Sequence, residues 1–238
     1  IVIDGGQLLE NMDKLGVANL TARLMNRGTK NKTVAELQDA IQELGASINV
    51  SASKENITIS GNTLAKNYTK TLTLVEEILL EPRWDANEFE LLKKSDVANL
   101  RQQSASPTSI TQNVYNELIY GKENIRSKNT LGTIESVGKI TLDDLKSFYN
   151  NNISPSIAKM HIVGDIKESD AVASLENLNS KWASKSVKIP EFKTPNAPNK
   201  PKVYFYDVPK AKQTVISFGA PALAVTDKEG SLIRFSMN

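Results

Sequence analysis

The stretch "GVANLTARLMNRGT", residues 16–29, decides how this chain folds. Its apolar residues recur at helical spacing, so it predicts a short amphipathic helix that ends at a glycine turn. The opposite face carries Asn19, Ala22 and Arg23, which suit neither an apolar core nor reactive chemistry. A glycine before the helix and a Gly-Thr pair after it form a frame that is built to present these three positions.

The segments that follow predict helices and one hairpin. Residues 33–44 and 68–82 have the apolar periodicity of helices, and Pro82 stops the second one. Between them, residues 47–61 alternate apolar and polar side chains around a central turn, which predicts an antiparallel hairpin. Asp85 can cap a further helix, and the stretch 158–165, "AKMHIVGD", predicts a short buried strand. Strands grouped with long helices, without strict βαβ alternation, favour an α+β class, with a mixed or antiparallel sheet and helices mainly on one face.

A proline-rich segment divides the chain. Residues 189–202, "IPEFKTPNAPNKPK", hold four of the nine prolines, so they predict a linker. We therefore expect a first subdomain over 1–188 and the truncated start of a second, similar subdomain over 203–238. The chain starts inside an apparent strand and lacks an initiator Met and a signal peptide, so we interpret it as a piece of a longer protein.

Composition excludes several classes of function. The 29 basic and 27 acidic residues nearly balance, and with 6% aromatic residues they provide no surface for nucleic acid. The chain has no cysteine, which excludes disulfides, Cys–zinc sites and thiol nucleophiles. No apolar run reaches the roughly 20 residues that a membrane span needs. The bias toward Lys and Asn indicates an AT-rich bacterial genome. We predict the periplasm or cell envelope as the location, with the cytoplasm as the alternative.

The opening stretch aligns with a known zinc motif. In the motif H-x-x-E-H, two histidines bind zinc and the glutamate activates a water molecule. The first histidine falls at Asn19, the glutamate at Ala22 and the second histidine at Arg23. With the hairpin, the paired helices and the Gly-Asp-ended strand in the right order, the chain resembles the pitrilysin/insulinase family of zinc metallopeptidases. This family includes the mitochondrial processing peptidases.

Departures from the motif predict that this chain has no catalytic residue and binds no metal. Asn19 is a poor zinc ligand, Ala22 cannot move a proton, and Arg23 repels a cation. The family's third ligand, a glutamate on the later paired helix, aligns near Ala98 and Asn99, where no carboxylate stands. We therefore expect a chain that restores the two histidines and the glutamate to remain inactive.

The resemblance implies a role beside a catalytic partner. Members of the family have two homologous halves, of which only the first holds zinc, while the second forms chamber wall and carries an Arg–Tyr pair that holds substrate. This chain resembles the first subdomain of such a second half, and the Arg–Tyr pair is expected beyond Asn238. Its partners would be a catalytic half and a peptide substrate in a zinc endopeptidase, so the parent protein would be a proteolytic hydrolase. A protease-derived structural subunit without peptidase activity is the alternative, and a stand-alone peptide-binding module ranks last.

Three further features of the sequence have both a functional and an ordinary structural interpretation. The stretch Asn49, Val50, Ser51 and Ala52 aligns with the family's substrate-pairing edge strand, although in this half plain sheet formation is favoured about threefold. His161, the single histidine, has no acidic partner at ligand spacing, and packing in the core or at a sheet edge is favoured over a metal role. Asp165, Glu168 and Asp170 do not match a calcium loop, and helix capping explains them better.

Overall fold

The computed structural model describes residues 1–192, 200, 202–209 and 211–219. The chain divides into two compact units. The first consists of Ile1–Gln102 with Asn129–Pro190, and the second of Gln103–Lys128 with Glu191–Asn238.

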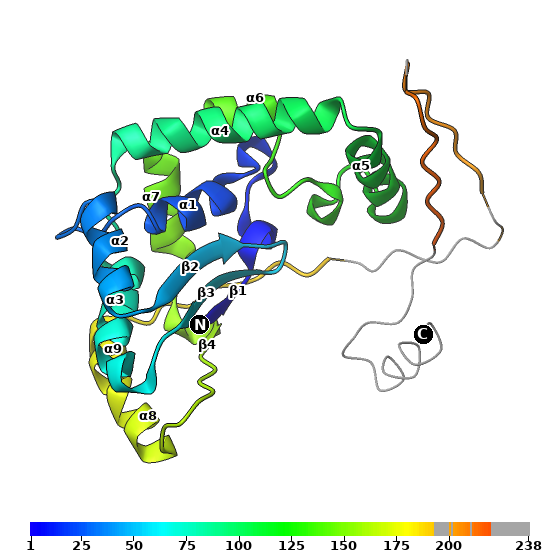
Figure 1. The fold of residues 1–238 in the computed structure, drawn as a ribbon. Coiled ribbons are helices and arrows are strands. Elements are labelled where there is room, and N and C mark those ends of the chain that lie inside the picture. The colour runs from blue at the N-terminus through cyan, green and yellow to red at the C-terminus, as the bar shows by residue number, and fades with distance from the viewer. Residues whose placement is uncertain (193–199, 201, 210, 220–238) are drawn as a thin grey trace. The chain divides into compact units, whose positions relative to one another are not determined.

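A four-stranded sheet forms the base of the first unit (Figure 1). Its strands are β1 (Val2–Asp4), β2 (Ser47–Ala52), β3 (Asn56–Asn62) and β4 (Ala158–Lys159). The spatial order is β2-β3-β1-β4, and every neighbouring pair is antiparallel. This confirms an α+β fold, and β2 lies at one edge of the sheet.

Helices make up most of the rest of the first unit. Their bounds are α1 (Val17–Met25), α2 (Val34–Glu43), α3 (Tyr68–Leu80), α4 (Ala86–Ser104), α6 (Ile134–Lys139), α7 (Leu142–Asn152), α8 (Glu168–Ser174) and α9 (Glu176–Lys181). Local sequence explains where several begin: Thr33 and Glu36 form a capping box on α2, and the Asp85 carboxylate accepts the first N–H groups of α4. The two short helices α8 and α9 meet at Leu175.

Two glycines frame α1, and each adopts a conformation that other residues rarely take. Gly16 and Gly28 both have a φ of +100°. A Cβ atom on Gly16 would lie 2.6 Å from the carbonyl oxygen of Leu131, and one on Gly28 would lie 2.7 Å from that of Lys32. Only glycine fits such positions, so the frame that the sequence suggested is a steric requirement.

The core lies between the sheet and its helices. In β2 and β3 the side chains of Ile48, Val50, Ile57 and Ile59 are buried, and polar residues alternate with them toward solvent. Helix α1 packs on β2 and on α7, and α4 crosses beyond α1 on the side away from the sheet (Figure 1). One face of the sheet is therefore covered, which holds α1 in a fixed position.

The strand expected over 158–165 is much shorter than predicted. Only Ala158 and Lys159 pair with β1, because that strand extends no further than Val2 in this direction. Beyond them His161 is exposed and Val163 is 99% exposed, so the prediction that His161 packs in the core or at a sheet edge is wrong.

The second unit contains α5 (Pro107–Tyr120) and a 3-10 turn at Ile125–Ser127. Lys128 pairs with Glu117 at 3.3 Å within this unit. The described residues 202–209 and 211–219 form no assigned strand. A strand needs a hydrogen-bonded neighbour, and the described residues provide none for these two segments. The predicted linker, residues 189–202, and the predicted second subdomain, residues 203–238, both lie mostly outside the described residues.

Candidate functional site

The face of α1 that the sequence singled out points toward α4. Asn19 is partly buried, Ala22 is fully buried, and the side chain of Arg23 is 29% exposed. Asn19 and Arg23 lie one helical turn apart, so both side chains can reach the same partner. The structure therefore brings together the two positions that align with the zinc-binding histidines.

That shared partner is Asp96 on α4. Asn19 Nδ2 donates to Asp96 Oδ2 at 3.0 Å, and Arg23 Nη1 donates to Asp96 Oδ1 in an ion pair. The Asp96 side chain is completely buried. Burial raises the pKa of Asp96, and the charge and hydrogen bond of Arg23 and the hydrogen bond from Asn19 oppose that rise. The result is a salt bridge that ties the motif helix to α4.

Sequence reasoning missed Asp96. It placed the third ligand position near Ala98 and Asn99, but both of these residues are exposed. A helix turns about 100° per residue, so Ala98 lies about 200° around α4 from Asp96. The available signal was the helical register, because Phe89, Leu92, Asp96 and Leu100 form the buried face of α4. A carboxylate in an otherwise apolar stripe indicates a buried partner.

Glu10 holds the start of α1. Its Oε2 accepts the N–H of Gly16 at 3.0 Å and its Oε1 accepts the N–H of Ala18 at 2.8 Å. Gly16 has no side chain that could cap the helix, so Glu10 supplies the missing acceptor from the preceding loop. Burial raises the pKa of Glu10 to about 8, although the two backbone hydrogen bonds act in the opposite direction.

The residues at this site do not fit a zinc ion. Asn19 presents its NH₂ group to Asp96, and Arg23 already places a positive charge beside the carboxylate. A catalytic zinc needs three protein ligands, and Asp96 is the one ligand of the usual type here. Among the described residues there is no group of three or more His, Cys, Asp or Glu side chains that could hold a metal ion.

The edge strand β2 has backbone groups directed away from the sheet. The N–H of Ile59 donates to the carbonyl of Ile1, so Ile59 faces β1. Val50 is the register partner of Ile59, and its N–H and C=O therefore point away from β3. By the same alternation the backbone groups of Ile48 and Ala52 also point outward, while Asn49 and Ser51 pair with β3.

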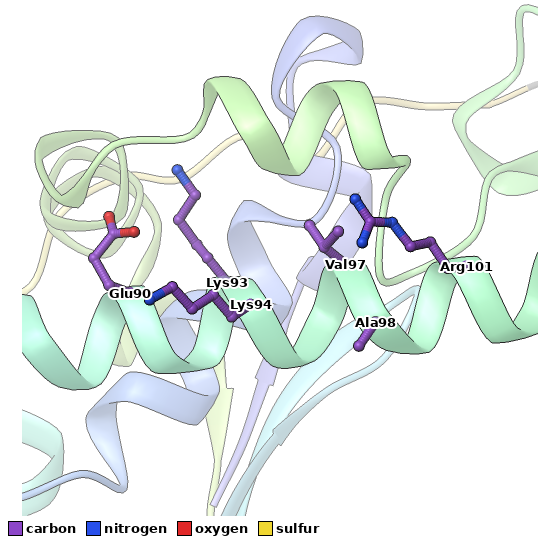
Figure 2. Close-up of a pocket in the computed structure, with 6 residues that line it drawn as sticks. All are labelled: Glu90, Lys93, Lys94, Val97, Ala98 and Arg101. Atoms are coloured by element: carbon purple, nitrogen blue, oxygen red, sulfur yellow. The ribbon is translucent and has the colours of Figure 1, made fainter.

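An open groove follows the outer face of α4 (Figure 2). It measures about 340 Å³ and is lined by Glu90, Lys93, Lys94, Val97, Ala98 and Arg101. These residues recur every three or four positions, so they form one stripe along the helix. Ala98 thus belongs to this groove rather than to the site at the motif helix.

Fold and site together define a class. The unit is α+β, and its glycine-framed helix carries Asn19, Ala22 and Arg23 where the resemblance expects the His, Glu and His of a zinc peptidase, as a non-catalytic form of such a domain would. Residues 1–128 match the family "Insulinase (Peptidase family M16)", and residues 139–233 match "Peptidase M16 inactive domain". The chain belongs to peptidase family M16 and is a non-catalytic fragment of it.

Relatives support the same assignment. A "Non-peptidase homolog YmxG" of Helicobacter pylori is 28% identical over 91% of this chain and 49% of its own length. The beta subunit of a probable mitochondrial-processing peptidase of Arabidopsis thaliana is 20% identical over 76% of this chain and 34% of its own. The chain therefore spans about half or less of the length of these relatives.

Solved structures share the fold. The peptidase M16 inactive domain from Pseudomonas fluorescens superposes with a TM-score of 0.76 at 23% identity, over 83% of this chain and 48% of that one. Pitrilysin gives a TM-score of 0.69 at 18% identity, over 82% of this chain and 21% of that one. In the part of the chain that the structure describes, no helix combines the length and apolar character of a membrane span.

Proposed function

We propose that this chain is part of the non-catalytic half of a zinc-dependent endopeptidase. It would pair with a catalytic M16 half, on the same chain or on a separate subunit, and form chamber wall and a peptide-contact surface. The observation that supports this proposal is the Arg23–Asp96 ion pair, which joins α1 to α4 at the helix face where the family resemblance would place the zinc ligands. Zinc is then expected in the catalytic half alone, and a bacterial periplasm or cell envelope is the proposed location.

The peptide-contact surface that we propose is the outer edge of β2. Ile48, Val50 and Ala52 direct their backbone N–H and C=O groups away from the sheet, so an extended peptide can add there as a further strand. The exposed side chains on this strand, Ser47, Asn49 and Ser51, are uncharged. Backbone pairing beside uncharged side chains would hold peptides with little discrimination between their sequences. Such a half contributes to the rate by positioning substrate and excluding water.

A structural subunit without peptidase activity is the second candidate. The relative from Helicobacter pylori is named a non-peptidase homolog, and yeast "Cytochrome b-c1 complex subunit 1, mitochondrial" is 26% identical over 75% of this chain. The Arg23–Asp96 ion pair between α1 and α4 is equally compatible with this role. The two candidates therefore differ in what the partner half does.

A reconstitution experiment separates the two candidates. Peptide cleavage is measured with the catalytic half alone, with this 238-residue chain added, and with the complete second half added. The proposal expects the complete second half to restore much of the turnover and this chain to restore little, because the substrate-holding Arg–Tyr pair is expected beyond Asn238. Equal turnover in all three mixtures would refute the chamber role and favour the structural subunit.

The contribution of β2 is tested within the complete second half. Ala52→Pro removes an outward N–H without breaking a bond to β3, so it should raise the KM for peptide. Ala52→Val keeps that N–H and is the matched control. Equal KM values for the two variants, with both folded, would exclude strand addition at this edge.

A further inference from the structure

A stretch without regular secondary structure leads from α9 to the end of the first unit. It comprises residues 183–190, here called the strap. Along the strap Lys185, Val187 and Ile189 are partly buried, and the residues between them are exposed. Of the strap residues, all of which the structure describes, Lys185 is the one that makes hydrogen bonds to the rest of the unit. The hold on the strap therefore depends mainly on this residue.

Two serines between α7 and β4 bind the backbone of Lys185. The Oγ of Ser154 donates to the carbonyl oxygen of Lys185 at 2.8 Å and accepts the N–H of Lys185 at 3.1 Å. The Oγ of Ser156 donates to the same carbonyl oxygen at 2.6 Å. Ser154 is fully buried, whereas Ser156 is exposed. One hydroxyl thus pairs with both backbone groups of Lys185, as a neighbouring strand would.

The side chain of Lys185 provides another attachment. Its Nζ donates to the carbonyl oxygen of Asn150, in the last turn of α7. The last four carbonyl groups of a helix have no partner within the helix, and a positive charge is favourable beside them. Lys185 therefore joins the strap both to the end of α7 and to the two serines that follow it.

We propose that Ser154, Ser156 and Lys185 form a clasp that holds the strap and can open while the core stays folded. The groups that form the clasp are polar, so water can bind each of them when it opens. The closed clasp fixes the point at which the chain leaves the first unit for the predicted linker, residues 189–202. With the clasp open, the last hydrogen-bonded residue before the linker is Trp182, at the end of α9. This change adds about 10 Å of extended chain, so the clasp gives the linker two tether lengths.

Amide hydrogen exchange of the 238-residue chain tests the clasp directly, because the N–H of Lys185 is one of its donors. In the wild-type chain this N–H should exchange more slowly than that of Ser186, which is exposed. Ser156→Ala removes one hydrogen bond and should speed exchange at Lys185 about fivefold. Ser154→Ala removes the acceptor itself and should speed it further. The N–H of Ile78, which is fully buried in α3, should exchange at the same rate in all variants.

Spin-label distances measure how firmly the strap is held. The chain has no cysteine, so Asp143→Cys on α7 and Lys188→Cys in the strap, both at exposed positions, can be labelled specifically. With the clasp intact, the two labels should give one narrow distance distribution. Adding Ser156→Ala with Lys185→Met should broaden it. Ser186→Ala, in the strap but outside the clasp, is the matched control and should leave the distribution narrow.

Several results would overturn the proposal. One is wild-type exchange at Lys185 that is as fast as at Ser186, and another is a rate at Lys185 that neither serine variant changes. A distance distribution that is broad in the wild-type chain, or that stays narrow in the clasp variant, would also contradict it. Exchange at Ile78 that accelerates together with Lys185 would show that the strap detaches only when the whole unit unfolds. Every contact of the clasp lies within the first unit, so these outcomes are independent of the proposed pairing with a catalytic half.

Discussion

Removing the charge of Arg23 should destabilise the first unit substantially. In Arg23→Met the apolar part of the side chain is kept, but Asp96 remains buried with only the Asn19 amide as a partner. Breaking a buried ion pair from one side costs about 3–5 kcal/mol. Because 29% of the Arg23 side chain is exposed, part of this energy is already screened by water. We therefore expect a loss of about 2–4 kcal/mol in the free energy of unfolding.

The assay is urea unfolding of the 238-residue chain followed by circular dichroism, with Asp96→Asn and the double variant completing a cycle. Asp96→Asn removes the carboxylate's charge and should cost less, about 1–2 kcal/mol, because Arg23 can still reach water. The double variant should lose less than the sum of the two single losses. As a control, Glu135→Gln breaks the exposed Glu135–Lys139 pair of 2.6 Å and should leave the unfolding midpoint unchanged.

The pH dependence of Arg23→Met provides a second check. Without the guanidinium, the pKa of the buried Asp96 carboxyl should rise further, and the protonated form should be preferred in the folded state. The folded variant then binds more protons than its unfolded form, so its stability should decrease as pH rises from the ordinary Asp value through the raised one. If Arg23→Met unfolds at the wild-type midpoint, or if the cycle shows no coupling, the ion pair does not join α1 to α4 energetically.

Three more outcomes are expected. Metal analysis should find no stoichiometric zinc in the purified chain. The double variant Asn19→His with Arg23→His should bind zinc through Asp96, because tetrahedral ligands lie about 3.3 Å apart and the Asn19–Asp96 contact measures 3.0 Å. Adding Asp96→Ala to that variant should abolish zinc binding. Because burial raises the pKa of Glu10 to about 8, the folded chain binds more protons than the unfolded chain between pH 4.5 and 8. Its free energy of unfolding should therefore decrease as pH rises through this range, by up to about 1.4 kcal/mol per pH unit. Glu10→Gln should flatten this dependence in unfolding titrations. Limited proteolysis should cut first within or after residues 189–202 and release a resistant core that ends near residue 190. Cleavage of that core before the C-terminal tail would contradict this prediction.

Local sequence was sufficient to predict the elements around the site. The glycine frame of α1, the hairpin of β2 and β3, and the Asp85 cap of α4 each depend on residues within a few positions of one another. Helical periodicity, capping residues and turn residues are all signals of this short range in sequence. The antiparallel α+β fold follows from these elements in order.

The contact of Asp96 with the motif helix could not be predicted in the same way. Asp96 lies 77 residues from Asn19 in sequence, and an alignment error of two residues on α4 exchanges its buried face for its exposed face. The sequence alone therefore predicts the third ligand position near Ala98 and Asn99, with no carboxylate to complete a restored site. The structure corrects this, because Asp96 lies within hydrogen-bonding distance of both motif positions.

The two ends of the Arg23–Asp96 pair explain how this unit can keep its fold without a metal ion. In a zinc site the cation joins ligands on two helices, and here the guanidinium of Arg23 brings positive charge from α1 to the carboxylate on α4. A catalytic zinc must also leave one coordination position open for water, whereas Arg23 and Asn19 fill both oxygens of Asp96. The contact that links the helices is therefore also the one that removes the chemistry.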